Sequence, residues 1–110
     1  MRGYHTVAKL GDLAPGEIRA LTVAGAEVIL YRSGDDYFAA ERYCVHQHAD
    51  LSAGEVAHGY LVCRLHGWRF DAATGVHEYS PMTCLRTYDV RIVGDDIQID
   101  PTPKRQGAAP

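Results

Sequence analysis

Two cysteine–histidine pairs in the middle of this 110-residue chain restrict its fold more than any other feature. One residue separates Cys44 from His46, two residues separate Cys63 from His66, and sixteen residues lie between the pairs. Each pair places a thiol and an imidazole so close in sequence that one tight loop can direct both at a small object. Two such loops, brought together, offer two sulfur and two nitrogen ligands to a metal centre.

The order of these residues distinguishes two kinds of metal site. Zinc accepts two cysteines and two histidines, but zinc fingers usually place both cysteines in one unit and both histidines in another. Here each pair mixes the two residue types, as a two-iron cluster requires when one iron takes both cysteines and the other both histidines. We therefore expect a [2Fe–2S] cluster held by Cys44, His46, Cys63 and His66. A zinc site and an arrangement without metal are the alternatives.

Alternating apolar residues and turn signals on either side of these pairs predict strands. The predicted strands cover residues 4–9, 17–23, 27–32, 37–42, 86–93 and a closing stretch through Ile97 and Ile99. The first four are expected to form a β-meander, and Tyr88, Val90 and Ile92 should share one face. No window has the apolar period of a helix. We expect an all-β sandwich or barrel interrupted by a cluster-binding subdomain.

The chain reads as a single domain over residues 1–100, with the cluster-binding subdomain at about residues 43–83. Residues 101–110 contain three prolines and few apolar residues, and they are expected to form a tail outside the core.

Composition excludes several classes of function. A net charge of −3 with scattered lysines and arginines argues against a nucleic-acid partner. No run approaches the roughly 18 apolar residues of a membrane span, and the first residues lack the apolar stretch of a signal peptide. Three cysteines, an odd number, argue against a disulfide framework. We expect a soluble, cytoplasmic protein.

The paired motifs resemble the soluble Rieske-type ferredoxins that serve bacterial oxygenases, and the resemblance covers most of the chain. Its further matches are the loop at residues 12–17, Leu51, residues 63–71, Thr74, Gly75, Pro81, Leu85, Tyr88, Val90 and the turn at residues 94–96. The resemblance implies a Rieske fold and a one-electron carrier that is not itself an enzyme. It also implies a monomer that receives electrons from an NAD(P)H-dependent flavoprotein reductase. A terminal oxygenase, expected to hydroxylate aromatic compounds, would take these electrons.

Comparison with the Rieske proteins of quinol-oxidising complexes implies a low redox potential. In those relatives a disulfide ties the cluster loops together, but here the two positions are His48 and Leu65. Hydroxyl groups that donate hydrogen bonds to sulfur are replaced by Trp68 and Phe70. Without these bonds the reduced cluster is less stabilised, so we expect a potential of roughly −150 mV. The expected surroundings of the cluster are Gly67, Trp68, Phe70 and Pro81.

The same resemblance implies a docking face. In the family the edges of the two ligating histidines reach the surface, which would make His46 and His66 the electron exit. Trp68 has two interpretations: an aromatic contact for the partner, or packing that supports the second cluster loop. Both stay open at this point.

The remaining candidates are expected to have no special function. His5, His48, His58 and His77 belong to no motif and should be exposed to solvent. Cys84 should be an inert, partly buried thiol.

Four other functions are alternatives to an oxygenase ferredoxin. A complete Rieske oxygenase needs a second, mononuclear iron site, for which 110 residues leave no room. A small subunit of a nitrite-reductase-like complex is the second alternative, but those subunits often lack one or more cluster ligands and this chain keeps all four. A ferredoxin of a di-iron monooxygenase and a structural zinc module complete the alternatives.

Overall fold

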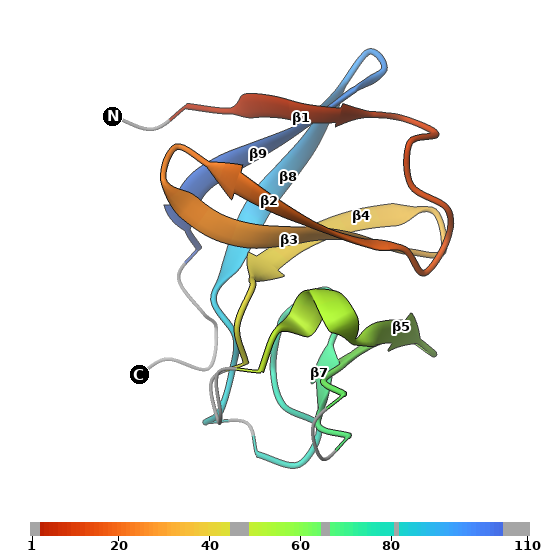
Figure 1. Cartoon of the computed structure of the whole chain (residues 1–110), viewed down its shortest axis with the longest axis vertical. Helices are drawn as coiled ribbons and strands as arrows, with labels where there is room; N and C mark the ends of the chain where they lie inside the picture. Colours follow the sequence, from red (N-terminus) through yellow and green to blue (C-terminus); the bar gives the residue numbers. More distant parts are fainter. Residues whose placement is uncertain (1–2, 45–48, 65–66, 81, 105–110) are drawn as a thin grey trace.

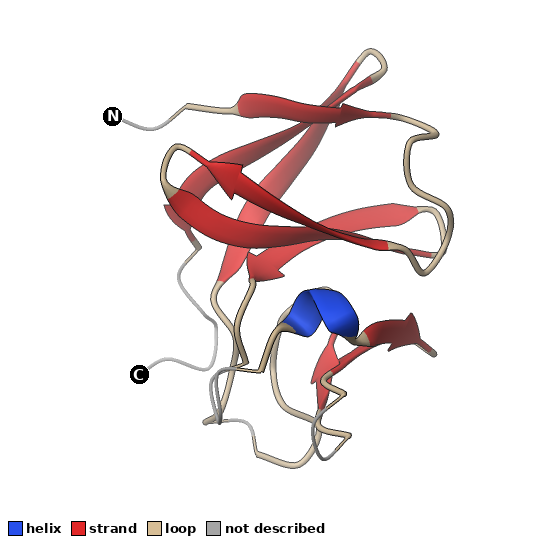
Figure 2. Ribbon diagram, in the orientation of Figure 1, coloured by secondary structure: helices blue, strands red, loops and turns tan. Residues whose placement is uncertain are grey.

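The computed structural model describes residues 3–44, 49–64, 67–80 and 82–104, and within them it contains nine strands and one 3-10 turn (Figures 1 and 2). The elements are β1 (His5–Lys9), β2 (Ile18–Val23), β3 (Ala26–Ser33), β4 (Asp36–Glu41), η1 (Leu51–Ala53), β5 (Glu55–Ala57), β6 (Tyr60–Val62), β7 (Arg69–Asp71), β8 (Thr87–Val93) and β9 (Asp96–Pro103). The expected all-β fold is confirmed. No helix in this part of the chain is long and apolar enough to cross a membrane.

Six strands form one antiparallel sheet in the order β1-β9-β8-β4-β3-β2. Strands β2, β3 and β4 form the expected meander. The prediction that β1 belongs to this meander is wrong, because β1 pairs with β9 and places His5 opposite Ile99. The loop of residues 10–17 carries the chain from one outer strand to the other, and β1 contacts β2. The sheet therefore curls into a nearly closed barrel (Figure 1).

Strand β3 is buried on both faces and separates two cores. Successive side chains of a strand point to opposite faces, so Val28 and Leu30 enter the barrel while Ile29 and Tyr31 face away from it. The barrel core consists of Ala8, Leu13, Val23, Val28, Leu30, Ala39, Tyr88, Ile97 and Ile99. The second core consists of Ile29, Tyr31, Ala40, Cys44, Leu51, Leu61, Cys63, Phe70, Ala72 and Leu85.

The chain leaves the barrel after β4 and returns to it directly beside that point. Ala40 lies opposite Thr87, the N–H of Glu41 donates to the carbonyl of Arg86 (2.9 Å), and the N–H of Arg86 donates to the Glu41 carboxylate (2.6 Å). Residues 42–85 lie between these positions and carry the sheet β5-β6-β7, seen in the lower half of Figure 1. Strands of three residues and one 3-10 turn leave no periodicity in the sequence, so these elements were not predicted.

The hairpin of β8 and β9 differs from its prediction at both ends. Tyr88 is buried as expected and Val90 is half-buried, but Ile92 is 44% exposed because it lies near the turn, beyond the barrel core. At the other end, β9 continues to Pro103, which lies opposite Tyr88. The strand therefore extends into the stretch that was expected to form the tail.

Candidate metal centre

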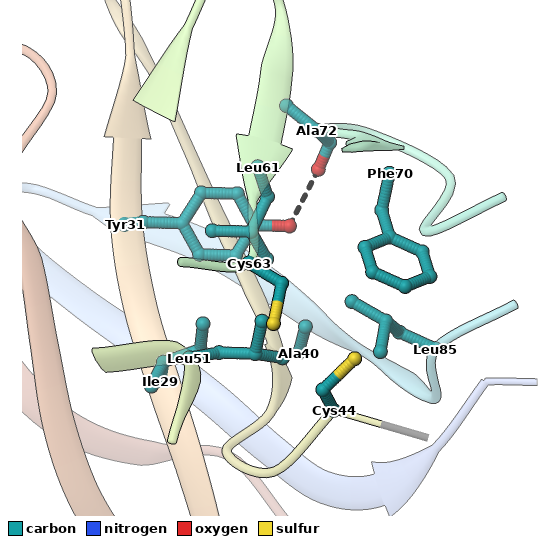
Figure 3. Packing of buried hydrophobic residues seen from close by; sticks show 10 residues of the cluster. All are labelled: Ile29, Tyr31, Ala40, Cys44, Leu51, Leu61, Cys63, Phe70, Ala72 and Leu85. Atoms are coloured by element: carbon teal, nitrogen blue, oxygen red, sulfur yellow. Dashed lines mark hydrogen bonds between the residues drawn. The ribbon is translucent and has the colours of Figure 1, made fainter. Parts of the chain in front are cut away.

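Cys44 and Cys63 lie in the core between the barrel and the small sheet, and both side chains are fully buried. Cys44 comes shortly after β4 and Cys63 directly after β6. Figure 3 shows the two sulfur atoms directed into the same space, with Phe70 and Leu85 beside them. These apolar neighbours keep water away from the sulfurs, as the shell of a metal–sulfur centre does.

Each cysteine begins a loop that is closed by the same backbone hydrogen bond. The N–H of Cys44 donates to the carbonyl of Ala49, and the N–H of Cys63 donates to the carbonyl of Trp68, both at 2.8 Å. In both loops the acceptor is therefore the fifth residue after the cysteine. Gly67, in the second loop, has a φ of +67°, a conformation that costs glycine little.

Four of the predicted residues, His46, His48, His66 and Pro81, lie outside the described part of the chain. The structure thus places Cys44 and Cys63 in one core, and the ligand roles of these cysteines and of the two histidines stay predictions. By sequence, His46 and His66 belong to the two loops that begin at the buried cysteines.

An ion pair braces the base of the first loop. The Arg42 guanidinium contacts the Asp50 carboxylate at 2.9 Å, and the carbonyl of Arg42 accepts from the N–H of Leu51 at 2.7 Å. The same carboxylate accepts from the backbone N–H (3.0 Å) and hydroxyl (2.6 Å) of Ser52, and it thereby caps η1. The hydrogen bond from Arg42, helped by those from Ser52, holds the pKa of Asp50 well below its usual range.

The second loop leads into β7, whose aromatic residues pack on the cysteine core. Phe70 is fully buried, and the partly exposed Trp68 packs against the same core. Their ring centroids are 6.3 Å apart. The packing role considered for Trp68 is therefore seen in the structure, and its docking role stays a prediction.

His77 contradicts the prediction that it is a free, exposed side chain. It is half-buried, and its ring makes edge contacts with Trp68 and Phe70, with centroid distances of 4.5 and 5.5 Å. Its Nδ1 accepts hydrogen bonds from the backbone N–H groups of Tyr79 and Ser80, each at 3.1 Å. No sequence motif signals this role, because it depends on how the backbone turns after the histidine.

His5 and His58 are exposed, as predicted. Cys84 is a half-buried free cysteine, which agrees with the burial expected for it.

Tyr31 is a residue of this region that sequence reasoning missed. Its hydroxyl donates to the carbonyl of Ala72 at 2.6 Å and so connects β3 with the chain that follows β7 (Figure 3, dashed line). Burial raises the pKa of Tyr31, which keeps the hydroxyl protonated as a donor. The available signal was a tyrosine at the end of an apolar run, since a buried hydroxyl needs a partner.

The donor set fits an iron–sulfur centre. Two buried thiols from equivalent loops supply soft ligands in an apolar setting. Within the described ranges, no group of three cysteine, histidine or acidic residues assembles a metal site. The other two predicted ligands, His46 and His66, belong by sequence to the two loops that begin at these cysteines.

Comparison with protein families matches residues 3–89 to the Rieske [2Fe-2S] domain. The ferredoxin subunit of anthranilate 1,2-dioxygenase from Burkholderia cepacia is 31% identical over 98 residues, covering 88% of this chain and 91% of the relative. The ferredoxin component of the naphthalene 1,2-dioxygenase system from Pseudomonas putida is 34% identical over 92 residues, covering 83% and 88%.

Solved structures point the same way. One similar chain comes from the complex of reduced oxygenase and oxidized ferredoxin in carbazole 1,9a-dioxygenase. It is 30% identical with a TM-score of 0.84, and the match covers 94% of this chain and 97% of the other.

Proposed function

Because the chain belongs to the Rieske [2Fe–2S] domain family, we propose that Cys44 and Cys63 hold one iron of the cluster and His46 and His66 the other. The observation that carries this assignment is the pair of fully buried cysteines, each at the start of an equally closed loop. The protein is a ferredoxin-type electron carrier that delivers electrons to a terminal oxygenase, and it is not a catalytic subunit.

The cluster supplies one-electron chemistry when bound. The residues of this chain would bind and shield the cluster. Two loops would supply the ligands, and Phe70, Leu61 and Leu85 would keep water away from the cysteine sulfurs. The Arg42–Asp50 pair holds the base of the first loop. A rigid apolar site of this kind limits the rearrangement that accompanies a change of charge, which favours rapid electron exchange.

We also propose that the cluster works at the low end of the Rieske range. Trp68 and Phe70 stand where quinol-oxidising relatives place hydroxyl donors, and neither has a hydroxyl to stabilise the reduced cluster. The expected midpoint is roughly −150 mV, and a measured value above about +100 mV would contradict it. Protein-film voltammetry gives this number directly.

The immediate electron donor is proposed to be an NAD(P)H-dependent flavoprotein reductase. His46, His66 and the exposed part of Trp68 would form the docking face, which the same carrier would present to the reductase and the oxygenase in turn. We further propose a cytoplasmic monomer with a single domain that includes the whole of β9, through Pro103, and has residues 43–83 as its cluster-binding part.

The ligand assignment is tested with single variants of each proposed ligand. Purified protein should show the absorption and EPR signals of a Rieske centre, whereas zinc is colourless and EPR-silent. Cys44→Ser, Cys63→Ser, His46→Ala and His66→Ala should each lose these signals, and iron content should fall with them. Cys84→Ser is the matched control and should keep both, because Cys84 is a half-buried cysteine outside the two paired motifs. Zinc in the parent protein, or a normal EPR signal in any of the four ligand variants, would reject the assignment.

The class of oxygenase is tested by reconstitution. The reduced protein should support turnover of an aromatic-ring dioxygenase, because its relatives serve such systems. Turnover with a di-iron monooxygenase alone would move the protein to that class.

A further inference from the structure

A short loop follows the turn after β7, and two backbone hydrogen bonds, from His77 to Thr83 and from Leu85 to Gly75, close its base. We call the described residues 77–80 and 82–83 the third loop. The N–H of His77 donates to the carbonyl of Thr83 at 2.9 Å, and the N–H of Thr83 donates to the carbonyl of Ser80 at 2.8 Å. The hydroxyl oxygens of Ser80 and Thr83 lie 3.1 Å apart. Two residues later Leu85 enters the core that holds Cys44 and Cys63.

His77 organises the first half of the third loop through its ring. Its Nδ1 accepts from the N–H groups of Tyr79 and Ser80, so this nitrogen carries no proton, and the two donors assign the neutral ring proton to Nε2. Asp71 does the same in the preceding turn, where one carboxylate oxygen accepts from Ala73 and Thr74 at 2.9 Å. The histidine thus takes the place of an aspartate or asparagine, the residues that usually cap such turns.

The same ring connects the third loop to the second cluster loop. It contacts Trp68 edge-on at 4.5 Å between centroids, and the carbonyl of Trp68 closes the loop that begins at Cys63. Beside this contact, the N–H of Glu78 donates to the carbonyl of Arg69 at 2.9 Å. The carboxylate of Glu78 also pairs with the guanidinium of Arg69 at 2.9 Å.

We propose that His77 is a positioning residue: its Nδ1 fixes the shape of the third loop, and its ring anchors that loop on Trp68. Leu85, two residues after this loop, packs in the same core as Cys44 and Cys63, so the position of the loop is tied to that core. The tip of this loop presents Tyr79 and Met82, which are 80% and 73% exposed.

The consequence for the redox centre rests on the proposed function. A one-electron reduction adds a negative charge, which water stabilises better than an apolar shell does. A loosened third loop would admit water and raise the midpoint potential. His77 therefore helps to keep the midpoint potential low through its contacts with Trp68 and Phe70.

Three variants of the holoprotein separate the two contributions of the ring. His77→Asn loses the ring but keeps an acceptor at the δ position, His77→Gln moves the acceptor one carbon further out, and His77→Phe keeps a ring without an acceptor. Hydrogen exchange of the peptide that spans residues 78–84 reports on the loop directly. We expect exchange in the Gln and Phe variants to be faster by about tenfold, the effect of losing two backbone hydrogen bonds, and the Asn variant to stay closer to the parent.

The midpoint potential is the second readout. It should rise in the Gln and Phe variants and rise less in the Asn variant, because an Asn acceptor restores the loop. Exchange of the peptide that contains β8 and β9 should be unchanged and serves as the folding control. Equal exchange in the Asn and Gln variants, or parent-like exchange in the Phe variant, would show that the acceptor does not hold the loop and would overturn the proposal. A parent protein without the Rieske signal would reject the proposed function instead, and the exchange experiment would still judge His77.

Discussion

At the scale of single residues, the hydroxyl of Tyr31 carries the direct link between the barrel and the end of the small sheet. It reaches from β3 to the carbonyl of Ala72, and both groups are buried. Removing one partner of a buried hydrogen bond leaves the other without a substitute from water. The cost of losing this hydroxyl should therefore exceed that of losing an exposed one.

Tyr31→Phe should lower the free energy of unfolding by about 1–3 kcal/mol, because the Ala72 carbonyl loses its donor while the ring still fills the core. Urea unfolding followed by circular dichroism measures the change. Tyr37→Phe on the neighbouring strand β4 is the control and should change stability by less than about 0.5 kcal/mol, since Tyr37 is partly exposed. Equal effects of the two substitutions would show that the Tyr31 bond contributes little.

The ionised carboxylate of Asp50 makes the stability of the first cluster loop depend on pH in the acid range. Its pKa is lowered in the folded protein, chiefly by the hydrogen bond from Arg42, and Glu27 also contacts that guanidinium at 3.4 Å. A lowered folded pKa means that the stabilisation is complete above the unfolded value of about 3.9 and is lost as the pH falls below it. The stability difference between the parent and Asp50→Asn should thus be constant from pH 7 to 5 and shrink below pH 4. Denaturant unfolding at several pH values measures it, and a constant difference down to pH 2 would contradict the assignment.

Single residues also show where sequence reasoning succeeds and where it stops. The spacing of Cys44 and Cys63 to histidines predicts both as ligands, because ligand chemistry restricts residue type and order. The structure buries the two cysteines in one core, and their role as ligands stays a prediction. His77 was missed, because its two hydrogen bonds depend on backbone N–H groups that any sequence would offer. The role of Trp68 was left open, because packing and docking both favour an aromatic residue.

At the scale of elements, glycines decide how closely the short pieces of the insertion can approach. Gly54 ends η1 with an ordinary φ of −83°, yet a Cβ built on it would overlap the carbonyl oxygen of Val62. Gly75 combines a φ of +76° with a Cβ position only 2.9 Å from the Thr87 methyl carbon. The first glycine permits η1 and β5 to pack on β6, and the second seats the turn after β7 against β8.

Gly54→Ala should destabilise the protein by at least about 2 kcal/mol, because backbone would have to move to admit one methyl group. Gly59→Ala is the informative control: its φ is +81° but its Cβ would meet nothing within 4 Å. That substitution should cost about 1–2 kcal/mol, from conformation alone. Thermal unfolding of the two variants compares them, and a Gly54 variant as stable as the parent would show that this contact yields easily.

The elements of the barrel were predictable to within a few residues, because their apolar residues alternate over five or more positions. Their pairing was not. The local sequence of β1 contains no signal that its partner is β9 at the other end of the chain, because that pairing depends on how the sheet closes. The insertion resisted prediction for the opposite reason: β5, β6 and β7 are three residues each and are held by tertiary contacts.

At the scale of the whole molecule, the two cores have different compositions. Among the buried residues that the structure describes, the barrel core draws only on the strands of the large sheet and on Leu13. The second core combines β3 and β4 with residues of the insertion, including both cysteines. Because the barrel has its own core, we expect it to remain folded without the cluster. The insertion has three very short strands and depends on its contacts with the barrel and on whatever its cysteines bind.

Loss of the metal centre should therefore loosen the insertion while the barrel persists. In Cys44→Ser, hydrogen exchange should accelerate in β5, β6 and β7 and stay close to the parent in β1, β8 and β9. Exchange measured by mass spectrometry on both proteins gives the comparison, with Cys84→Ser as the control for the loss of a thiol. Uniform acceleration along the chain would mean that the two cores unfold as one unit.

The way the chain leaves and re-enters the barrel has a consequence for protein engineering and for the evolution of the fold. Glu41 and Arg86 hold each other through two backbone-donated hydrogen bonds, so the ends of the excursion between them already sit at the spacing of neighbouring strands. A tight turn could replace the whole excursion without moving either strand. Transplanting the excursion onto another hairpin would also require the face of β3 and β4 on which it packs, because Ile29, Tyr31 and Ala40 belong to the same core as the two cysteines. The redox function would thus be gained or lost with one insertion, provided that the barrel keeps this face.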